Sequence, residues 1–247
     1  MPVVPETPLR IGLLQCGHIH HELVPDHGDY PEAFADLLGP HGVELTTFDV
    51  DHGAPPTDLG AFDGWLVSGS ASSAYDDLPW IPPVEDLLRR MIHEQVPVVA
   101  VCFGHQLLAQ AMGGRVAKAG PGWGVGAHDY ELVGPPSPWM VPPPAGTVRL
   151  IASHQDQVVE LPDGAVLIAR TDHCPVAAYT LGPTALAIQP HPEFTAAVSQ
   201  GLVERRREAI GADRSDEALA TLDRPLDQDL VAGWMAEFLR RAAAGRP

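Results

Sequence analysis

One stretch of the chain restricts the possible fold more than any other. Residues 96–102, VPVVAVC, are apolar throughout and lack the polar alternation of half-exposed strands. Such a strand is buried on both faces, which is typical of the centre of a parallel sheet. A helical pattern, FGHQLLAQAMGG, follows directly at 103–114. The stretch therefore predicts an α/β fold in which Cys102 lies where a central strand ends and a helix begins.

The first half of the chain repeats this alternation of strands and helices. In the segment 84–94, apolar residues recur every three or four positions on one helix face, and Pro82 and Pro83 precede them. Right-handed crossovers then predict a doubly wound, mostly parallel sheet flanked by helices, with ligands beyond the carboxyl ends of the strands. The expected strands cover 10–16, 43–50, 62–70 and 96–102, and the expected helices 30–42 and 84–94.

The second half has a different pattern. Between about residues 114 and 190, short strand patterns are separated by Gly and Pro turns, which predicts a small antiparallel addition to the sheet. Residues 195–247 have the spacing of helices. We expect a single domain over 1–247, with a core over about 9–195 and a C-terminal helical extension over 196–247.

Composition limits the partners and the location. The formal net charge of −17 repels phosphate backbones and anionic headgroups, so we expect no nucleic acid and no membrane partner. No apolar run reaches the roughly 18 residues of a membrane span, and the start lacks the features of a signal peptide. Cys16, Cys102 and Cys174 are too few and too far apart for a disulfide framework, so we expect a cytoplasmic protein.

Cys102 is the candidate nucleophile. A sharp turn between a strand and a helix exposes a side chain at the sheet edge, and Gly104 lets the backbone turn tightly. The helix N-terminus that follows favours a thiolate over a thiol. The alternative is a buried structural cysteine, because a free cysteine packs as a small hydrophobe. The strand end, the glycine and the helix start together favour the functional interpretation.

A nucleophilic thiol needs a base, and the base needs an orienting group. The segment AIQPHPEF, 187–194, offers both in His191 and Glu193. Residues two apart in extended chain point the same way, and Pro192 keeps His191 out of the helical region. A neighbouring carboxylate fixes the tautomer of an imidazole and stabilises its charged form. Taken alone, the short motif also fits a proline turn with two solvated polar residues.

Four motifs in order along the chain resemble the class I (triad) glutamine amidotransferases, and among them the stand-alone GMP-synthase-like proteins. They are SGSASSAYDD at 68–77, AVCFGHQ at 100–106, SHQDQV at 153–158 and HPE at 191–193. The resemblance covers about residues 9–195 and implies a flavodoxin-like fold. It also implies hydrolysis of a glutamine-type amide: Cys102 attacks the γ-carboxamide and forms a γ-glutamyl thioester. His191 acts as the base and then protonates the leaving ammonia, and Glu193 orients His191.

The resemblance also implies the surroundings of the nucleophile. The backbone of Phe103, Ser70 and Gly69 would form the oxyanion hole. Two positions depart from the family pattern: Ala100 replaces the usual glycine before the cysteine, and Ser70 replaces the second loop glycine. The residues at positions that line the glutamine pocket are Gln106, His154, Gln155 and Asp156.

The segment CGHIHHE, 16–22, contains side chains that can bind zinc or copper. They lie in one short loop, and the sequence shows no second cluster that would complete a tetrahedral site. We therefore expect a loop that flanks the active-site edge, with no metal and no cofactor. The clustered residues are Cys16, His18, His20, His21 and Glu22.

Three functions remain open at this level. In the first, the chain is a glutaminase that passes ammonia to a separate synthetase subunit, because no Gly-x-x-x-x-Gly-Lys nucleotide loop is present. In the second, it is a stand-alone γ-glutamyl hydrolase or peptidase acting on a γ-glutamyl small molecule. In the third, it is an idle regulatory binding subunit. The complete set of Cys102, His191 and Glu193 argues against the third.

Overall fold

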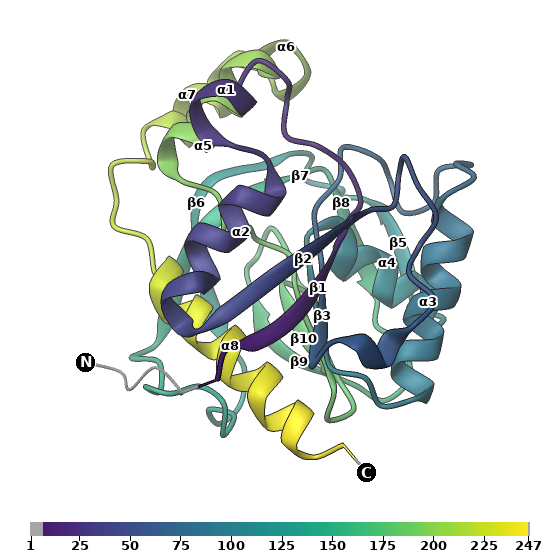
Figure 1. Ribbon diagram of the computed structural model, residues 1–247. Coiled ribbons are helices and arrows are strands. Elements are labelled where there is room, and N and C mark those ends of the chain that lie inside the picture. Colours follow the sequence, from purple (N-terminus) through teal and green to yellow (C-terminus); the bar gives the residue numbers. More distant parts are fainter. Residues whose placement is uncertain (1–6, 247) are drawn as a thin grey trace.

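A nine-stranded sheet forms the centre of the computed structural model, which describes residues 7–246 (Figure 1). Five strands are parallel, in the spatial order β2 (Val43–Asp49), β1 (Leu9–Gln15), β3 (Gly64–Val67), β4 (Val98–Val101) and β11 (Ala185–Ile188). The sheet continues in antiparallel fashion through β10 (Ala178–Leu181), β9 (Ala165–Arg170), β6 (Gly124–Leu132) and β7 (Thr147–His154). A separate pair is formed by β5 (Arg115–Lys118) and β8 (Asp156–Glu160).

Helices cover both faces of the sheet. On one face lie α2 (Tyr30–Leu38) and α8 (Gln228–Ala244), and on the other α3 (Ile81–His93) and α4 (Phe103–Ala111). Short 3-10 turns, η1 (Gly39–His41) and η2 (Leu59–Ala61), flank β2 and β3. The remaining helices, α5 (Ala196–Arg205), α6 (Arg207–Ile210) and α7 (Ala212–Leu219), gather beside α1 (Val24–His27) at the top of Figure 1.

The last helix belongs to the same core as the first strand. Met235 and Leu239 of α8 and Ile11 and Leu13 of β1 are fully buried in one apolar cluster. Full burial of a side chain of this size contributes about 1.5–3 kcal/mol relative to exposure. The helices after residue 195 therefore help to close one face of the sheet.

The parallel core predicted from the sequence is confirmed, but its central strands are shorter than expected. The expected strand 62–70 is only β3, Gly64–Val67, because residues 68–70 leave the sheet and enter a loop. The expected helix 84–94 starts earlier, at Ile81, since prolines are tolerated in a first helical turn. β8, Asp156–Glu160, lies within the stretch where short antiparallel strands were expected, and it pairs with β5 away from the main sheet.

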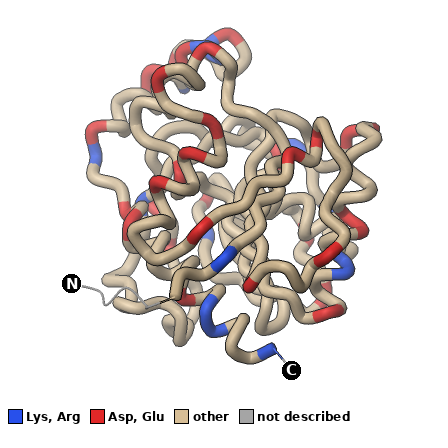
Figure 2. Tube along the Cα trace, in the orientation of Figure 1, with Lys and Arg blue, Asp and Glu red and all other residues tan. Residues whose placement is uncertain are grey.

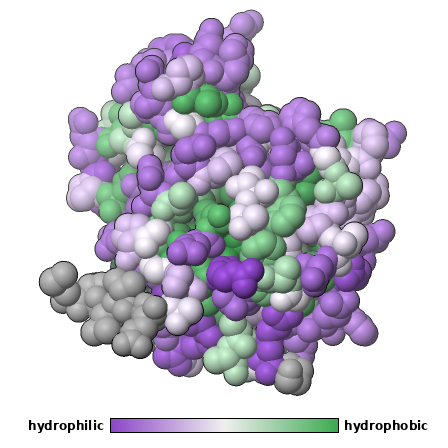
Figure 3. Space-filling view, viewed as in Figure 1, coloured by the Kyte–Doolittle hydropathy of each residue, from purple (hydrophilic) through white to green (hydrophobic). Residues whose placement is uncertain are grey.

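Acidic residues are distributed over the whole trace, with fewer basic residues among them (Figure 2). On the face shown in Figure 3, polar side chains cover most of the rim and the α5–α7 region, and apolar ones gather near the middle. Within residues 7–246, every helix is too short or too polar to cross a bilayer.

Candidate active site

The candidate residues meet at one edge of the sheet. Cys102 follows β4, His191 follows β11, and the loop of residues 68–70 follows β3. These three strands are neighbours and run parallel, so their carboxyl ends lie side by side. In open α/β sheets this edge is where ligands bind.

Cys102 occupies a strained turn. Its backbone has φ 53° and ψ −100°, in the left-handed half of conformational space that residues other than glycine rarely adopt. Its amide donates a 2.8 Å hydrogen bond to the carbonyl of Ile188 in β11, and α4 begins at the next residue. The surrounding sheet therefore holds the thiol at the strand-to-helix junction.

Gly104 has a different role from the one we expected. It does not adopt a positive φ, so it does not supply the tight turn itself. A Cβ atom at Gly104 would lie 2.8 Å from the carbonyl oxygen of Val67 in β3. The glycine is thus required for close packing of α4 against β3, and Cys102 bears the unusual backbone angles.

His191 and Glu193 form a buried pair. Nδ1 of His191 lies 2.6 Å from Oε1 of Glu193, and their side chains are 2% and 0% exposed. The ring of Phe194 stacks on His191 with ring centres 4.0 Å apart. The amide of His191 donates to the carbonyl of Ile151 in β7 at 2.8 Å. Packing and hydrogen bonds together fix the orientation of the imidazole.

The electrostatics of this pair favour a charged imidazole. Burial by itself lowers the pKa of His191, because it disfavours the charged form. The negative charges of Cys102 and Glu193, and side-chain hydrogen bonds to both, outweigh burial and raise the pKa to about 10. The imidazole of His191 is therefore charged at neutral pH, beside the sulfur of Cys102.

The loop after β3 lies against the imidazole. A Cβ atom at Gly69 would be 2.5 Å from the hydroxyl of Tyr30 and 3.0 Å from Cε1 of His191, so no larger residue fits there. Ser70 lines the same pocket as Cys102. Phe103 is the first residue of α4, where backbone N–H groups have no partner within the helix. Of the three residues expected at the oxyanion hole, Phe103 follows Cys102, Ser70 shares its pocket, and Gly69 lies against the imidazole.

A pocket of about 310 Å³ opens in front of Cys102. Asp156 lines it and accepts hydrogen bonds from the hydroxyls of Ser73, at 2.5 Å, and Tyr75, at 2.9 Å. Gln106 also borders the pocket, but its amide nitrogen donates to the carbonyl of Asp156 and to Oε1 of Gln189. The contacts of Gln106 are therefore those of a residue that supports the pocket wall.

His154 ends β7, and Gln155 connects it to β8 beside Asp156. Burial, followed by the charges of His173 and His191, lowers the pKa of His154 to about 3, so its ring is neutral at physiological pH. Nδ1 of His154 lies 3.2 Å from the carbonyl oxygen of Asp156. Gln155 is half-buried on the pocket wall, and its carbonyl accepts a 2.8 Å hydrogen bond from the amide of Ala119.

The sequence interpretation missed two cations at the pocket. Lys118, at the end of β5, and Arg206, after α5, both line it, and neither pairs with a carboxylate among residues 7–246. The guanidinium of Arg206 lies over the ring of Trp123, 5.7 Å from its centre. One signal was available, since Lys118 is the single lysine in a chain of net charge −17.

In the loop after β1, most of the side chains that are neighbours in the sequence point to different partners. Cys16 is fully buried, its thiol faces the carbonyl of Leu14, and burial raises its pKa far above the usual range. His20 and His21 stack on each other, and Glu22 pairs with Arg205. Only His18 of this loop points toward other metal-ligating side chains.

Comparison with known proteins identifies the family of the chain. The family model for class I glutamine amidotransferases matches residues 23–206, which is most of the chain. The matched range includes Cys102, His191 and Glu193. The chain belongs to this family. The expected enzyme class, a cysteine-dependent amidotransferase or hydrolase, and the expected flavodoxin-like fold are thereby confirmed.

Relatives within the family differ in their named activities. The chain is 35% identical over 185 residues to gamma-glutamyl peptidase 4 of Arabidopsis thaliana, covering 72% of this chain and 73% of that one. It is 33% identical over 180 residues to one subunit of the glutamine-hydrolyzing GMP synthase of Halobacterium salinarum, covering 70% and 88%. A solved glutamine amidotransferase from Methylobacillus flagellatus superposes with a TM-score of 0.71 at 25% identity, covering 98% and 96%.

Proposed function

We propose that this protein hydrolyses a γ-glutamyl amide bond through a thioester on Cys102. The observation that carries the proposal is the strained junction that presents Cys102, with the buried His191–Glu193 pair beside it. A thiolate is the nucleophile in such chemistry, and the imidazolium donates a proton to the leaving nitrogen.

The steps follow from the positions of these groups. The thiolate of Cys102 attacks the γ-carbonyl carbon, and the backbone N–H groups of Phe103 and of the Gly69–Ser70 segment stabilise the oxyanion. His191 gives its proton to the leaving nitrogen, so an amine or ammonia departs and the thioester remains. His191, now neutral, takes a proton from water, which attacks the thioester and releases glutamate and the thiolate. Glu193 keeps Nδ1 of His191 protonated throughout.

We assign the glutamyl end of the substrate to the pocket of Asp156. The carboxylate of Asp156 is held by two hydroxyls and offers further lone pairs to an α-ammonium group. Lys118 and Arg206 lack carboxylate partners among the described residues and offer charge to substrate carboxylates. In an acidic chain, two such cations at one pocket favour a substrate with more than one carboxylate.

The preferred substrate class is therefore a γ-glutamyl peptide or conjugate, whose leaving part carries its own carboxylate. A second hollow, of about 20 Å³, is lined by His191 and shares Ser70 and Arg206 with the main pocket. The similarity to gamma-glutamyl peptidase 4 supports the same substrate class.

A glutaminase subunit is the second candidate. Similarity to the GMP synthase subunit of Halobacterium salinarum favours it, and ammonia would then pass to a separate synthetase. We further propose a cytoplasmic protein that does not bind nucleic acid, supported by three free cysteines and a net charge of −17.

The test compares glutamine with γ-glutamyl dipeptides as substrates of the purified chain. Release of glutamate from the dipeptides at a higher kcat/KM than from glutamine supports the peptidase assignment. Hydrolysis of glutamine alone supports the glutaminase subunit. No hydrolysis of either, together with no covalent adduct of a glutamine-like electrophile on Cys102, contradicts both. Cys102→Ala, compared by circular dichroism with the wild type, is the control for a contaminating hydrolase.

Lys118→Met tests the assigned recognition. It should raise KM for a γ-glutamyl dipeptide about two- to fivefold, the scale of one exposed ion pair, and leave kcat unchanged. Arg115→Met is the matched control, because Arg115 lies on the same strand and pairs with Glu160 instead. An equal KM change in both variants would contradict the role of Lys118.

A further inference from the structure

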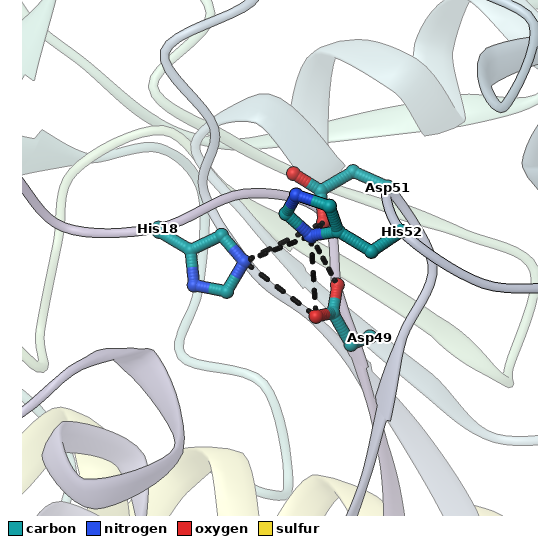
Figure 4. A group of neighbouring side chains, drawn as sticks. All are labelled: His18, Asp49, Asp51 and His52. Atoms are coloured by element: carbon teal, nitrogen blue, oxygen red, sulfur yellow. Dashed lines mark hydrogen bonds and ion pairs between the residues drawn. The ribbon is translucent and has the colours of Figure 1, made fainter.

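Four metal-ligating side chains converge at the carboxyl ends of β1 and β2, outside the catalytic groups. They are His18, from the loop after β1, and Asp49, Asp51 and His52, at and after the end of β2. One ligand atom from each lies within 4.8 Å of the corresponding atom of every other. Figure 4 shows the two imidazole rings and the two carboxylates directed toward one another.

The separations are those of a tetrahedral coordination shell. Nε2 of His18 lies 3.3 Å from Nδ1 of His52 and 3.6 Å from an oxygen of both Asp49 and Asp51. Nδ1 of His52 is 3.3 Å from Asp49 and 3.1 Å from Asp51. Zinc bonds of about 2.0–2.1 Å to nitrogen and oxygen give tetrahedron edges of roughly 3.3–3.4 Å. The four atoms are thus already spaced to surround one ion.

The carboxylate of Asp29, which lies outside the cluster, orients His18. Nδ1 of His18 lies 2.6 Å from Oδ2 of Asp29, which also accepts from Gln15 at 2.9 Å, while Oδ1 of Asp29 accepts from the amide of Ile19 at 2.8 Å. In the neutral tautomer that donates from Nδ1 to Asp29, Nε2 of His18 is the ring nitrogen that carries a lone pair, and this atom faces the cluster. Carboxylate–histidine–metal arrangements of this kind are usual around zinc.

No lysine or arginine among residues 7–246 pairs with the carboxylates of the cluster. Oδ1 of Asp51 is shielded from solvent and accepts no hydrogen bond within the part of the chain that the structure describes. It faces the carboxylate of Asp49 and the nitrogens of two imidazoles. Two carboxylates and two neutral imidazole nitrogens repel one another at these distances unless protons or a metal ion supply positive charge between them.

We propose that His18, Asp49, Asp51 and His52 bind one divalent transition-metal ion of the zinc type. Two imidazoles and two carboxylates without a thiolate are ligands that suit zinc. The ion connects the loop after β1 to the loop after β2. His18 also lines the small hollow that contains Ser70 and His191, so the ion stabilises the loop that borders the active site. It takes no part in the chemistry at Cys102.

The test is calorimetric titration of an untagged, chelator-treated Cys102→Ala chain with zinc chloride. This background removes the thiolate that would compete for zinc and separates the result from enzyme activity. We expect one equivalent of zinc, and at least roughly tenfold weaker binding in the added variant His52→Ala, the scale on which even outer-shell partners matter. Cobalt(II) should give the intense visible bands of tetrahedral coordination, and His52→Ala should lose them.

The matched control is His21→Ala, which removes an exposed histidine of the same loop that does not belong to the cluster. It should bind zinc like its parent. His52 is largely exposed, so its removal should leave the thermal unfolding of the metal-free chain unchanged. Absence of zinc binding, or equal binding in the His52→Ala variant and its parent, would overturn the proposal and leave a protonated ion-pair cluster.

Discussion

Replacing Glu193 by glutamine tests the proposed catalytic arrangement most directly. The substitution preserves the shape of the side chain and removes its charge. The amide oxygen can still accept a hydrogen bond from Nδ1 of His191, so the ring keeps its orientation. What is lost is the attraction between a buried carboxylate and a buried imidazolium.

The expected size follows from Coulomb's law. Two unit charges about 4 Å apart interact by about 4 kcal/mol at an effective dielectric constant near 20. Since about 1.4 kcal/mol corresponds to a factor of ten in rate, kcat/KM for a γ-glutamyl substrate should fall about a thousandfold. Glu193 is one of the groups that raise the pKa of His191, so this pKa should fall as well.

Steady-state hydrolysis and NMR titration of the His191 ring measure the two effects. Glu204→Gln is the matched control, because Glu204 is an exposed carboxylate whose partner is Gln200. It should change neither quantity. A Glu193→Gln enzyme with wild-type kcat/KM and a His191 pKa still near 10 would refute the reasoning.

Three further predictions concern the pocket and the core. Gly69→Ala should lower kcat, measured by steady-state hydrolysis, because the new Cβ would lie 3.0 Å from Cε1 of His191; unchanged kcat would contradict this contact. Burial lowers the pKa values of His105 and His154 to about 3, so both rings are neutral when folded. The unfolded chain therefore binds more protons below pH 6.5, and stability measured by urea unfolding should fall by about 2 kcal/mol per histidine between pH 7 and pH 5. His105→Phe should remove its share of this dependence, and an unchanged pH profile would contradict a buried neutral ring. Met235→Ala should reduce the free energy of unfolding by about 2–5 kcal/mol if α8 completes the core, and a change near zero would contradict that role.

The sequence was most informative where the signal is local. The apolar run at 96–102 predicted a central parallel strand, and β4 pairs in parallel with both of its neighbours. The motifs that contain the candidate residues Cys102, His191 and Glu193 lie at strand ends, as their apolar flanks predicted. The orientation of His191 toward Glu193 also follows from residues only two positions apart.

The sequence was least informative about contacts between residues that are far apart along the chain. Gly104 was interpreted as a turn residue, but its constraint comes from Val67 in another strand. Lys118 and Arg206 are 88 positions apart in the numbering, yet both line the pocket. Neither lies within a motif that would have marked it.

The sequence by itself determined the alternation of strands and helices, the position of the candidate nucleophile and the order of the motifs, because these depend on side-chain periodicity and on near neighbours. Only the tertiary structure decided which loops meet. The parallel register that pairs Gln15 with Asp49 places the ends of β1 and β2 side by side, and so brings His18 to Asp49, Asp51 and His52. Contacts of that kind arise from strand pairing across more than thirty residues, which no local pattern records.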